Sequence, residues 1–318
     1  MKTTLRPRVA QRVVLPKLEQ NILRVILYFN VFDHPLTADE IYTYLPMRAS
    51  SPAAVARALL SLERRSHIRS EGVFHFLATA SDRCASERTA KELRAVRRLV
   101  IARLVGRFIG LFPFVQAVML SGELSKGVAG PASDIDFVVV AKKRRLWICR
   151  SILIAFKKIF LFNSKKYFCL NHFIDDSTLV VDARNYYSAL ELATLKPLMN
   201  PELHARYLAA NRWISEFFPN LELPEVAGEP PSHLPVRSLP ENVIPREWAD
   251  RIDVFLMTTW QGIWNRRYAK LSEPERNHMF RCLPGMSTAY GEDFQKKVLN
   301  RYAYRLRQYG LPPLGHSN

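Results

Sequence analysis

Cysteine is scarce in this chain, and the four cysteines are not spaced as a site. Cys84, Cys149, Cys169 and Cys282 lie far apart, and none belongs to a C-x-x-C pair. This spacing excludes the usual cysteine pattern of a zinc site and gives no sign of a disulfide framework. The cysteines suit a reducing compartment, so we expect a cytoplasmic protein.

A long uninterrupted apolar run is also missing. The two most apolar stretches, residues 100–120 and 146–162, are broken by Arg, Lys or Pro before they reach the roughly 18 apolar residues of a membrane-spanning helix. Residues 1–17 are basic and contain no apolar segment long enough for a secretory signal. We therefore expect no membrane span. Residues 146–162 carry basic side chains that suit a helix at a membrane surface, but burial against a sheet is the favoured interpretation.

Acidic residues are outnumbered by basic ones. The chain holds 46 Lys plus Arg against 29 Asp plus Glu, which gives a formal net charge of +17. This charge favours an anionic partner such as nucleic acid, a nucleotide or a lipid surface. An even spread of charge that only keeps the protein soluble is the alternative. With 318 residues, 48% of them hydrophobic, the chain is long enough for two or three domains.

The pattern of residues 17–82 predicts three helices followed by a β-hairpin. Residues 17–31 have apolar side chains at helical spacing, Thr37 begins a capping-box pattern, and Ser51 precedes a proline at a typical helix start. Residues 67–77 then alternate apolar and polar side chains around a Glu-Gly turn.

This order of elements resembles winged helix-turn-helix domains, in which the third helix usually enters the major groove of DNA. The resemblance implies a nucleic-acid-binding surface on or near that helix. The arginines there are candidates for phosphate contacts: Arg57, Arg64, Arg65 and Arg69. The alternative is that the domain packs against its neighbour or mediates protein contacts.

Strand and helix patterns alternate over residues 83–225, which predicts an α/β (α+β) domain. We expect a helix over 86–110, strands over 114–120 and 134–141, a helix over 146–160, strands over 166–174 and 177–182, and helices over 186–198 and 201–218. The composition of the remaining segments predicts a basic tail over 1–16, a proline-rich linker over 226–240 and a helical C-terminal region over 241–318.

Two aspartates, Asp134 and Asp136, stand at the start of a very apolar strand. Residues two apart in a strand point to the same side, so we expect the two carboxylates to lie parallel. Such a pair is costly to bury unless a cation neutralises it. Carboxylate oxygens are ligands for Mg²⁺, which fills its remaining positions with water and substrate phosphate. The pattern therefore predicts a Mg²⁺ site for phosphoryl or nucleotidyl transfer.

A glycine-containing turn precedes this pair of aspartates. Gly122 follows the strand expected over 114–120, and a residue without a Cβ lets backbone N–H groups approach a phosphate. Ser121, Ser125 and Lys126 stand in the same turn and are candidates to bind phosphate oxygens.

Together these residues resemble the signature of the DNA polymerase β-like nucleotidyltransferase superfamily. The signature joins a glycine turn, here within residues 120–123, to an Asp-x-Asp strand, here within residues 133–137. The resemblance extends over residues 100–182 and implies a mixed sheet flanked by helices. It also implies that Asp134 and Asp136 hold two Mg²⁺ ions and that a nucleoside triphosphate transfers its monophosphate to a hydroxyl acceptor, with release of pyrophosphate.

Two positions depart from the family pattern. Glu123 stands where the family usually has Ser, and its charge opposes a bound triphosphate unless Lys126 or a metal ion offsets it. Asn171 stands on the strand where the resemblance implies a third carboxylate. The substitutes in another strand register are Asp175, Asp176 and Asp182. A second function is therefore open: a catalytically degenerate nucleotide- or nucleic-acid-binding protein that acts through its winged helix.

Overall fold

The computed structural model describes residues 15–226 and 245–313, which form two compact units. The N-terminal unit consists of the described parts of Met1–Asp82, Phe218–Asn220 and Asn300–Asn318. The α/β unit consists of the described parts of Arg83–Phe217 and Leu221–Leu299. Most of the expected basic tail and of the proline-rich linker lies outside the described residues.

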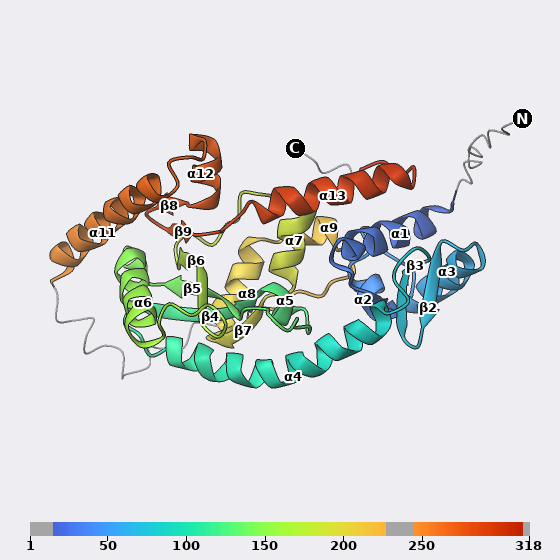
Figure 1. Cartoon of the computed structure of the whole chain (residues 1–318), viewed down its shortest axis with the longest axis horizontal. Helices are drawn as coiled ribbons and strands as arrows, with labels where there is room; N and C mark the ends of the chain where they lie inside the picture. The colour runs from blue at the N-terminus through green and yellow to red at the C-terminus, as the bar shows by residue number, and fades with distance from the viewer. Residues whose placement is uncertain (1–14, 227–244, 314–318) are drawn as a thin grey trace, which may run out of the picture. The chain divides into compact units, whose positions relative to one another are not determined.

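The N-terminal unit contains the three expected helices and the hairpin (Figure 1). Its elements are α1 (Lys17–Phe29), η1 (Asn30–Phe32), β1 (Leu36–Thr37), α2 (Ala38–Thr43), α3 (Pro52–Arg64), β2 (Ile68–Glu71) and β3 (Phe74–Leu77). Thr37 and Glu40 form the expected capping box at the start of α2, and the Ser51 side chain caps α3. The two-residue strand β1, which the sequence pattern did not predict, joins the hairpin in a sheet of order β1-β3-β2.

The far end of the chain completes the N-terminal unit. Tyr302 of helix α13 (Phe294–Gln308) packs edge-on against Tyr28 of α1, with ring centroids 5.1 Å apart. Arg24 donates a hydrogen bond to the carbonyl oxygen of Pro312 at 3.2 Å. Asn220 donates to the carbonyl oxygens of Tyr42 and Met47. These contacts join segments more than 170 residues apart in the sequence into one folded unit.

The α/β unit is built on a six-stranded mixed sheet of order β7-β4-β5-β6-β9-β8. Its strands are β4 (Val115–Ser121), β5 (Asp136–Ala141), β6 (Cys169–Asp175), β7 (Lys196–Met199), β8 (Cys282–Leu283) and β9 (Met286–Thr288). Only β5 and β6 run parallel, and the other neighbours are antiparallel. The expectation of a mixed sheet with helices is confirmed.

Helices cover this sheet, and five of them contribute buried side chains to one apolar core with its central strands. The helices are α4 (Cys84–Ile109), α5 (Gly122–Ser125), α6 (Leu146–Phe160), α7 (Tyr186–Ala193), α8 (Pro201–Ala210), α9 (Ile214–Phe217), α11 (Arg246–Arg267) and α12 (Glu273–Met279). The five that contribute to the core are α4, α5, α6, α11 and α12. Trp147 of α6 is fully buried in the core, together with Ala102 of α4 and Trp264 of α11. Burial of one face of α6 against the sheet is therefore confirmed. Within residues 15–226 and 245–313, no helix combines the length and the hydrophobicity that a bilayer-spanning segment needs.

Four expectations about secondary structure were wrong. The helix expected over 201–218 is divided into α8 and α9, and the C-terminal region 241–318, expected to be helical, contributes β8 and β9 to the sheet. Residues 177–182 form no strand, since the N–H of Val181 donates to the side chain of Asn211 instead of to a neighbouring strand. The helix expected over 186–198 ends at Ala193, and β7 follows it. β7 lies at the edge of the sheet, where Pro197 is tolerated because its missing N–H need not face a partner strand.

Candidate functional site

The ends of three neighbouring strands meet at the candidate site. Asp136 is the first residue of β5 and lies opposite Ser121, the last residue of β4. Cys169, the first residue of β6, lies opposite Asp136 on its other side. Gly122 follows Ser121 directly. The sheet register therefore brings the glycine turn and one aspartate of the pair to the same end of the sheet, where these strands begin or end.

Gly122 is held against the carboxylate of Asp136. Its backbone has φ +70°, a left-handed conformation that residues other than glycine rarely adopt. A Cβ built on Gly122 would lie 2.5 Å from the Oδ2 atom of Asp136. This contact requires glycine for two reasons, the backbone conformation and the space that the carboxylate occupies.

Asp134 lies in the loop before β5, because the strand begins only at Asp136. The expectation that strand geometry makes the two carboxylates parallel was therefore wrong. Other groups position the loop. Ile135 donates its N–H to the carbonyl oxygen of Lys166 at 3.1 Å, and Arg98 donates to the carbonyl oxygen of Pro131 at 2.8 Å.

Glu123 helps to hold the same loop. Its Oε2 atom accepts hydrogen bonds from the hydroxyl of Ser133 at 2.6 Å and from the N–H of Gly130 at 3.2 Å. The carboxylate therefore takes part in the structure of the loop that leads to Asp134. This contact supplies a local role for the glutamate that departs from the family pattern.

Burial has the largest effect on the ionisation of Asp136. Burial raises the pKa of the Asp136 carboxyl above its usual value, and the charges of Asp134 and Glu191 raise it further. A hydrogen bond from the thiol of Cys169 and the charge of Lys126 act in the opposite direction. Burial and the nearby Asp136 raise the pKa of the Cys169 thiol to about 12, so the thiol remains a donor.

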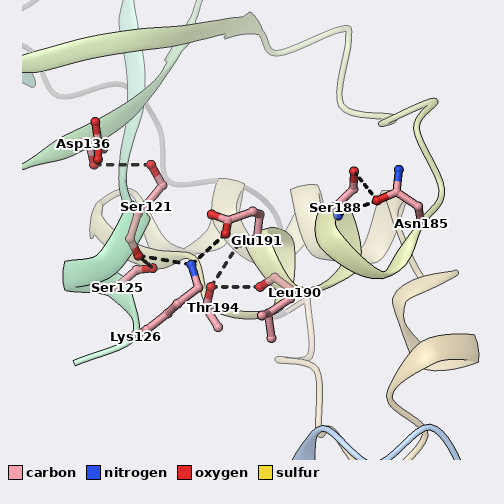
Figure 2. A network of polar contacts seen from close by, with 10 residues as sticks. Ser121, Ser125, Lys126, Asp136, Asn185, Ser188, Leu190, Glu191 and Thr194 are labelled. Carbon is pink, nitrogen blue, oxygen red and sulfur yellow. Dashed lines mark hydrogen bonds and ion pairs between the residues drawn. The ribbon is translucent and has the colours of Figure 1, made fainter. Parts of the chain in front are cut away.

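The side chains of Lys126 and Ser125 both have hydrogen-bond partners, as Figure 2 shows. The ammonium group of Lys126 lies 2.8 Å from the Oε1 atom of Glu191 and 3.2 Å from the carbonyl oxygen of Gly122. Ser125 is buried, and its hydroxyl donates to the same carbonyl at 2.9 Å. Ser121 is partly exposed, with its hydroxyl 3.5 Å from the backbone oxygen of Asp136.

Helix α7 brings two residues to the site that the sequence analysis missed. Glu191 pairs with Lys126 and acts electrostatically on Asp136. Tyr187, one helical turn earlier, is partly buried, and its pKa is raised by burial and then by the charge of Glu191. The helical pattern of α7 was visible in the sequence, and Asn185 caps the helix. No local signal indicated that this face of α7 lies beside the glycine turn.

Asn171 is the residue that the structure places beside Asp136 from β6. Its amide nitrogen lies 3.5 Å from Oδ1 of Asp136 and 2.9 Å from the sulfur of Cys169. The register of β5 and β6 shifts at this point, so Asn171 has no direct opposite residue. An amide thus stands at the position where the family resemblance implies a third carboxylate.

The three substitute carboxylates do not lie at the end of the sheet that carries Asp136. Asp175 lies opposite Ala141, five residues along β5 from Asp136, which corresponds to about 16 Å of strand. Asp176 follows it and accepts a hydrogen bond from the N–H of Lys143. Asp182 is exposed in a segment without strand structure. The alternative strand register is therefore wrong.

The donor set at the site suits Mg²⁺ better than a structural metal ion. No group of three or more His, Cys, Asp or Glu side chains that could hold a metal ion occurs in the part of the chain that the structure describes. Mg²⁺, however, is usually bound through one or two carboxylates, with water and phosphate oxygens as the remaining ligands. Asp134 and Asp136 fit this requirement, because their mutual repulsion is relieved by a cation.

The four arginines of the N-terminal unit fall into two groups. Arg57 and Arg64 are exposed on α3. Arg65 is exposed and lies 3.9 Å from the carboxylate of Glu19. Arg69 is occupied, because it pairs with Asp82 at 2.7 Å and stacks over a phenylalanine ring. Arg57 and Arg64 are therefore the better placed of the four for contacts with a partner.

Three comparisons with known proteins complete the description of the chain. No family, no curated protein and no solved structure gave a match.

Proposed function

We propose that the α/β unit is a Mg²⁺-dependent nucleotidyltransferase with the fold of the DNA polymerase β-like superfamily. The observation that carries the proposal is the contact between Gly122 and the carboxylate of Asp136 at the ends of β4 and β5. A glycine with positive φ against a strand-leading aspartate, with a second aspartate two residues earlier, agrees with the motif that the sequence resembles. The parallel arrangement of β5 and β6 adds support, because it brings Asn171 to the end of the sheet that carries Asp136.

In this function Asp134 and Asp136 hold Mg²⁺, which supplies positive charge to the phosphates of the nucleotide. The acceptor oxygen forms a bond to the α-phosphorus, the bond to pyrophosphate breaks, and the hydroxyl proton leaves to a carboxylate or to water. Lys126, whose charge acts on Asp136, is the cation that we assign to the phosphate oxygens, and a phosphate that binds it competes with Glu191.

Calorimetric titration with ATP, GTP, CTP and UTP, with and without Mg²⁺, tests the proposal. We expect Mg²⁺-dependent binding of at least one nucleotide, and its loss in the double variant Asp134→Asn, Asp136→Asn. The substitutions keep the size of the side chains and remove both charges, so a loss of binding reports on the metal and not on the fold. Binding that is unchanged in the double variant would refute the proposal.

Asn171→Asp is expected to strengthen Mg²⁺ binding. The amide lies 3.5 Å from Asp136, so a carboxylate there adds a third oxygen ligand with charge. We expect the apparent dissociation constant for Mg²⁺ to fall about tenfold, the equivalent of one additional charged contact of about 1.4 kcal/mol. Isothermal titration of the variant with MgCl₂ measures this change. Weaker Mg²⁺ binding would show that added repulsion outweighs the new ligand.

A second candidate function is nucleic-acid binding by a catalytically degenerate protein, with the N-terminal unit as a winged helix. The exposed Arg57 and Arg64 on the third helix support it, as does the amide of Asn171 in place of a carboxylate. We expect Arg57→Ala and Arg64→Ala each to weaken DNA or RNA binding and to reduce the slope of log K against log salt by about 1. Fluorescence anisotropy at 50 to 200 mM salt, about the range over which such contacts weaken most, measures the slope.

Arg69→Ala serves as the contrast to these two variants. Because Arg69 is bound to Asp82 and stacked on Phe76, we expect its replacement to lower the thermal stability and to leave the salt slope unchanged. An equal change of slope in all three variants would contradict the division of the arginines. Affinity that does not depend on salt would contradict the candidate function itself.

A further inference from the structure

An exposed apolar patch lies where the C-terminal ends of α4 and α6 meet. Its apolar members come from the end of α4 and the turn after it, and from the end of α6 and the loop after it: Leu104, Phe108, Leu111, Ile159, Phe160 and Phe162. Phe162 is 91% exposed, and the other five side chains are between 41% and 69% exposed. We call this set the end patch. Solvent exposure of six large apolar side chains in one place is unusual for a surface without a partner.

Ring contacts show that the two helix ends form one continuous surface. Phe108 of α4 lies 5.3 Å from Phe156 of α6, measured between ring centroids, and Phe156 stacks on Phe160 at 5.0 Å. Phe112 closes the cluster at 5.2 Å from Phe156. The ends of α4 and α6 are also next to each other in Figure 1. The partly buried rings thus support the exposed side chains around them.

The loop after α6 holds Phe162 away from the core. Phe162 and Asn163 have φ values of 47° and 59°, a left-handed conformation that is uncommon for a bulky residue such as Phe. The N–H of Asn163 donates to the carbonyl oxygen of Lys157 at 3.0 Å, and the N–H of Ser164 donates to that of Leu161 at 2.8 Å. These hydrogen bonds maintain a turn that presents the phenyl ring to solvent.

The segments that form the end patch carry charge of one sign only. Arg107, Lys158, Lys165 and Lys166 are exposed on the same helix ends and loop. The segments that form the patch contain no acidic residue, since no Asp or Glu occurs from 93 to 122 or from 137 to 174. A partner for this surface must therefore combine negative charge with an apolar environment.

We propose that the end patch docks on the surface of an anionic lipid bilayer. The apolar side chains enter the boundary between head groups and acyl chains, and the lysines and arginine bind the anionic head groups. Nucleic acid explains the charge but not Leu104, Leu111 and Ile159, because alkyl side chains do not stack on bases as aromatic rings do. A second copy of the chain explains the apolar surface but not the charge, because it brings basic residues against basic residues.

The loop of the end patch also borders the candidate site. The N–H of Ile135, between the two aspartates, donates to the carbonyl oxygen of Lys166. Docking of the patch therefore brings the start of β5, which carries Asp136, close to the lipid surface. The docking itself does not depend on the proposed nucleotidyl transfer, and it is tested without a nucleotide.

Co-sedimentation of the full chain with lipid vesicles tests the proposal. We expect binding to vesicles of phosphatidylcholine with phosphatidylglycerol, little binding to phosphatidylcholine alone, and weaker binding as salt is raised. Lys165→Ala with Lys166→Ala should weaken binding by roughly 25-fold, about fivefold for each lysine. Phe162→Ser should weaken it by about tenfold or more, because a phenyl ring no longer leaves water. Circular dichroism confirms that the variants are folded.

Two matched variants separate the end patch from general surface effects. Val73→Ser removes a similarly exposed apolar side chain at the hairpin of the N-terminal unit. Arg266→Ala with Lys270→Ala removes two exposed basic residues elsewhere on the α/β unit. Both should bind anionic vesicles like the wild type. The proposal is overturned if the wild type does not bind anionic vesicles or if the matched variants lose as much as the patch variants. It is also overturned if the patch variants lose binding only to single-stranded RNA.

Discussion

Asp136→Asn should lower Mg²⁺-dependent nucleotide transfer on the order of 10⁴-fold, the scale seen when a central catalytic group is removed. The side chain keeps its size, so the contact with Gly122 remains, but the charge that binds Mg²⁺ is lost. Transfer is measured with an α-phosphate-labelled nucleotide and a panel of hydroxyl acceptors that includes protein, RNA and sugars.

Asp182→Asn is the matched control for this change. It makes the same substitution at an exposed aspartate in a segment without strand structure. We expect transfer within about twofold of wild type, because surface substitutions usually change free energies by less than about 0.5 kcal/mol. Full transfer by Asp136→Asn would exclude Asp136 as a metal ligand. A large loss of transfer in Asp182→Asn would show that Asp182 takes part in the reaction, which contradicts its assignment as a surface residue.

Gly122→Ala should impair both stability and transfer. The backbone has φ +70°, which costs a non-glycine residue about 1 to 3 kcal/mol. The new Cβ would also lie 2.5 Å from Oδ2 of Asp136, so the carboxylate must move. Displacement of a reacting group by about 1 Å lowers a rate by roughly 10²-fold. Thermal unfolding measures the first effect, and the transfer assay measures the second.

Gly127→Ala separates the two effects of that substitution. Gly127 belongs to the same turn region and has φ +76°, but apart from its chain neighbours no atom lies within 4 Å of the position of its added Cβ. We expect a similar loss of stability with transfer nearly unchanged. If both glycine variants lost transfer equally, backbone strain rather than contact with Asp136 would explain the effect.

Local chemistry made much of the fold predictable. Thr37 and Glu40 form a capping box because the two groups lie within one turn, and Ser51 before a proline starts α3 for the same reason. The hairpin over 67–77 follows from alternation of side chains around Gly72, whose φ is +59°. Each of these features depends on residues close together in the sequence.

Pairing with distant strands was not predictable in this way. Residues 177–182 have the composition of a strand, but the N–H of Val181 finds the side chain of Asn211 instead of a neighbouring strand. The segment 196–199 was expected to continue a helix, but it pairs with β4 at the edge of the sheet. A strand forms only where another strand offers its edge, and that edge is supplied by tertiary structure.

The same distinction between local and distant residues applies to the candidate site. The sequence by itself determined the glycine turn, the Asp-x-Asp pattern and the excess of basic residues, because these depend on residue type and short spacing. Only the tertiary structure decided that Asn171 stands beside Asp136 and that Glu191 pairs with Lys126. The physical reason is that strand register and helix packing, which minimise exposed apolar surface over the whole unit, set distances between residues whose separation in sequence carries no such information.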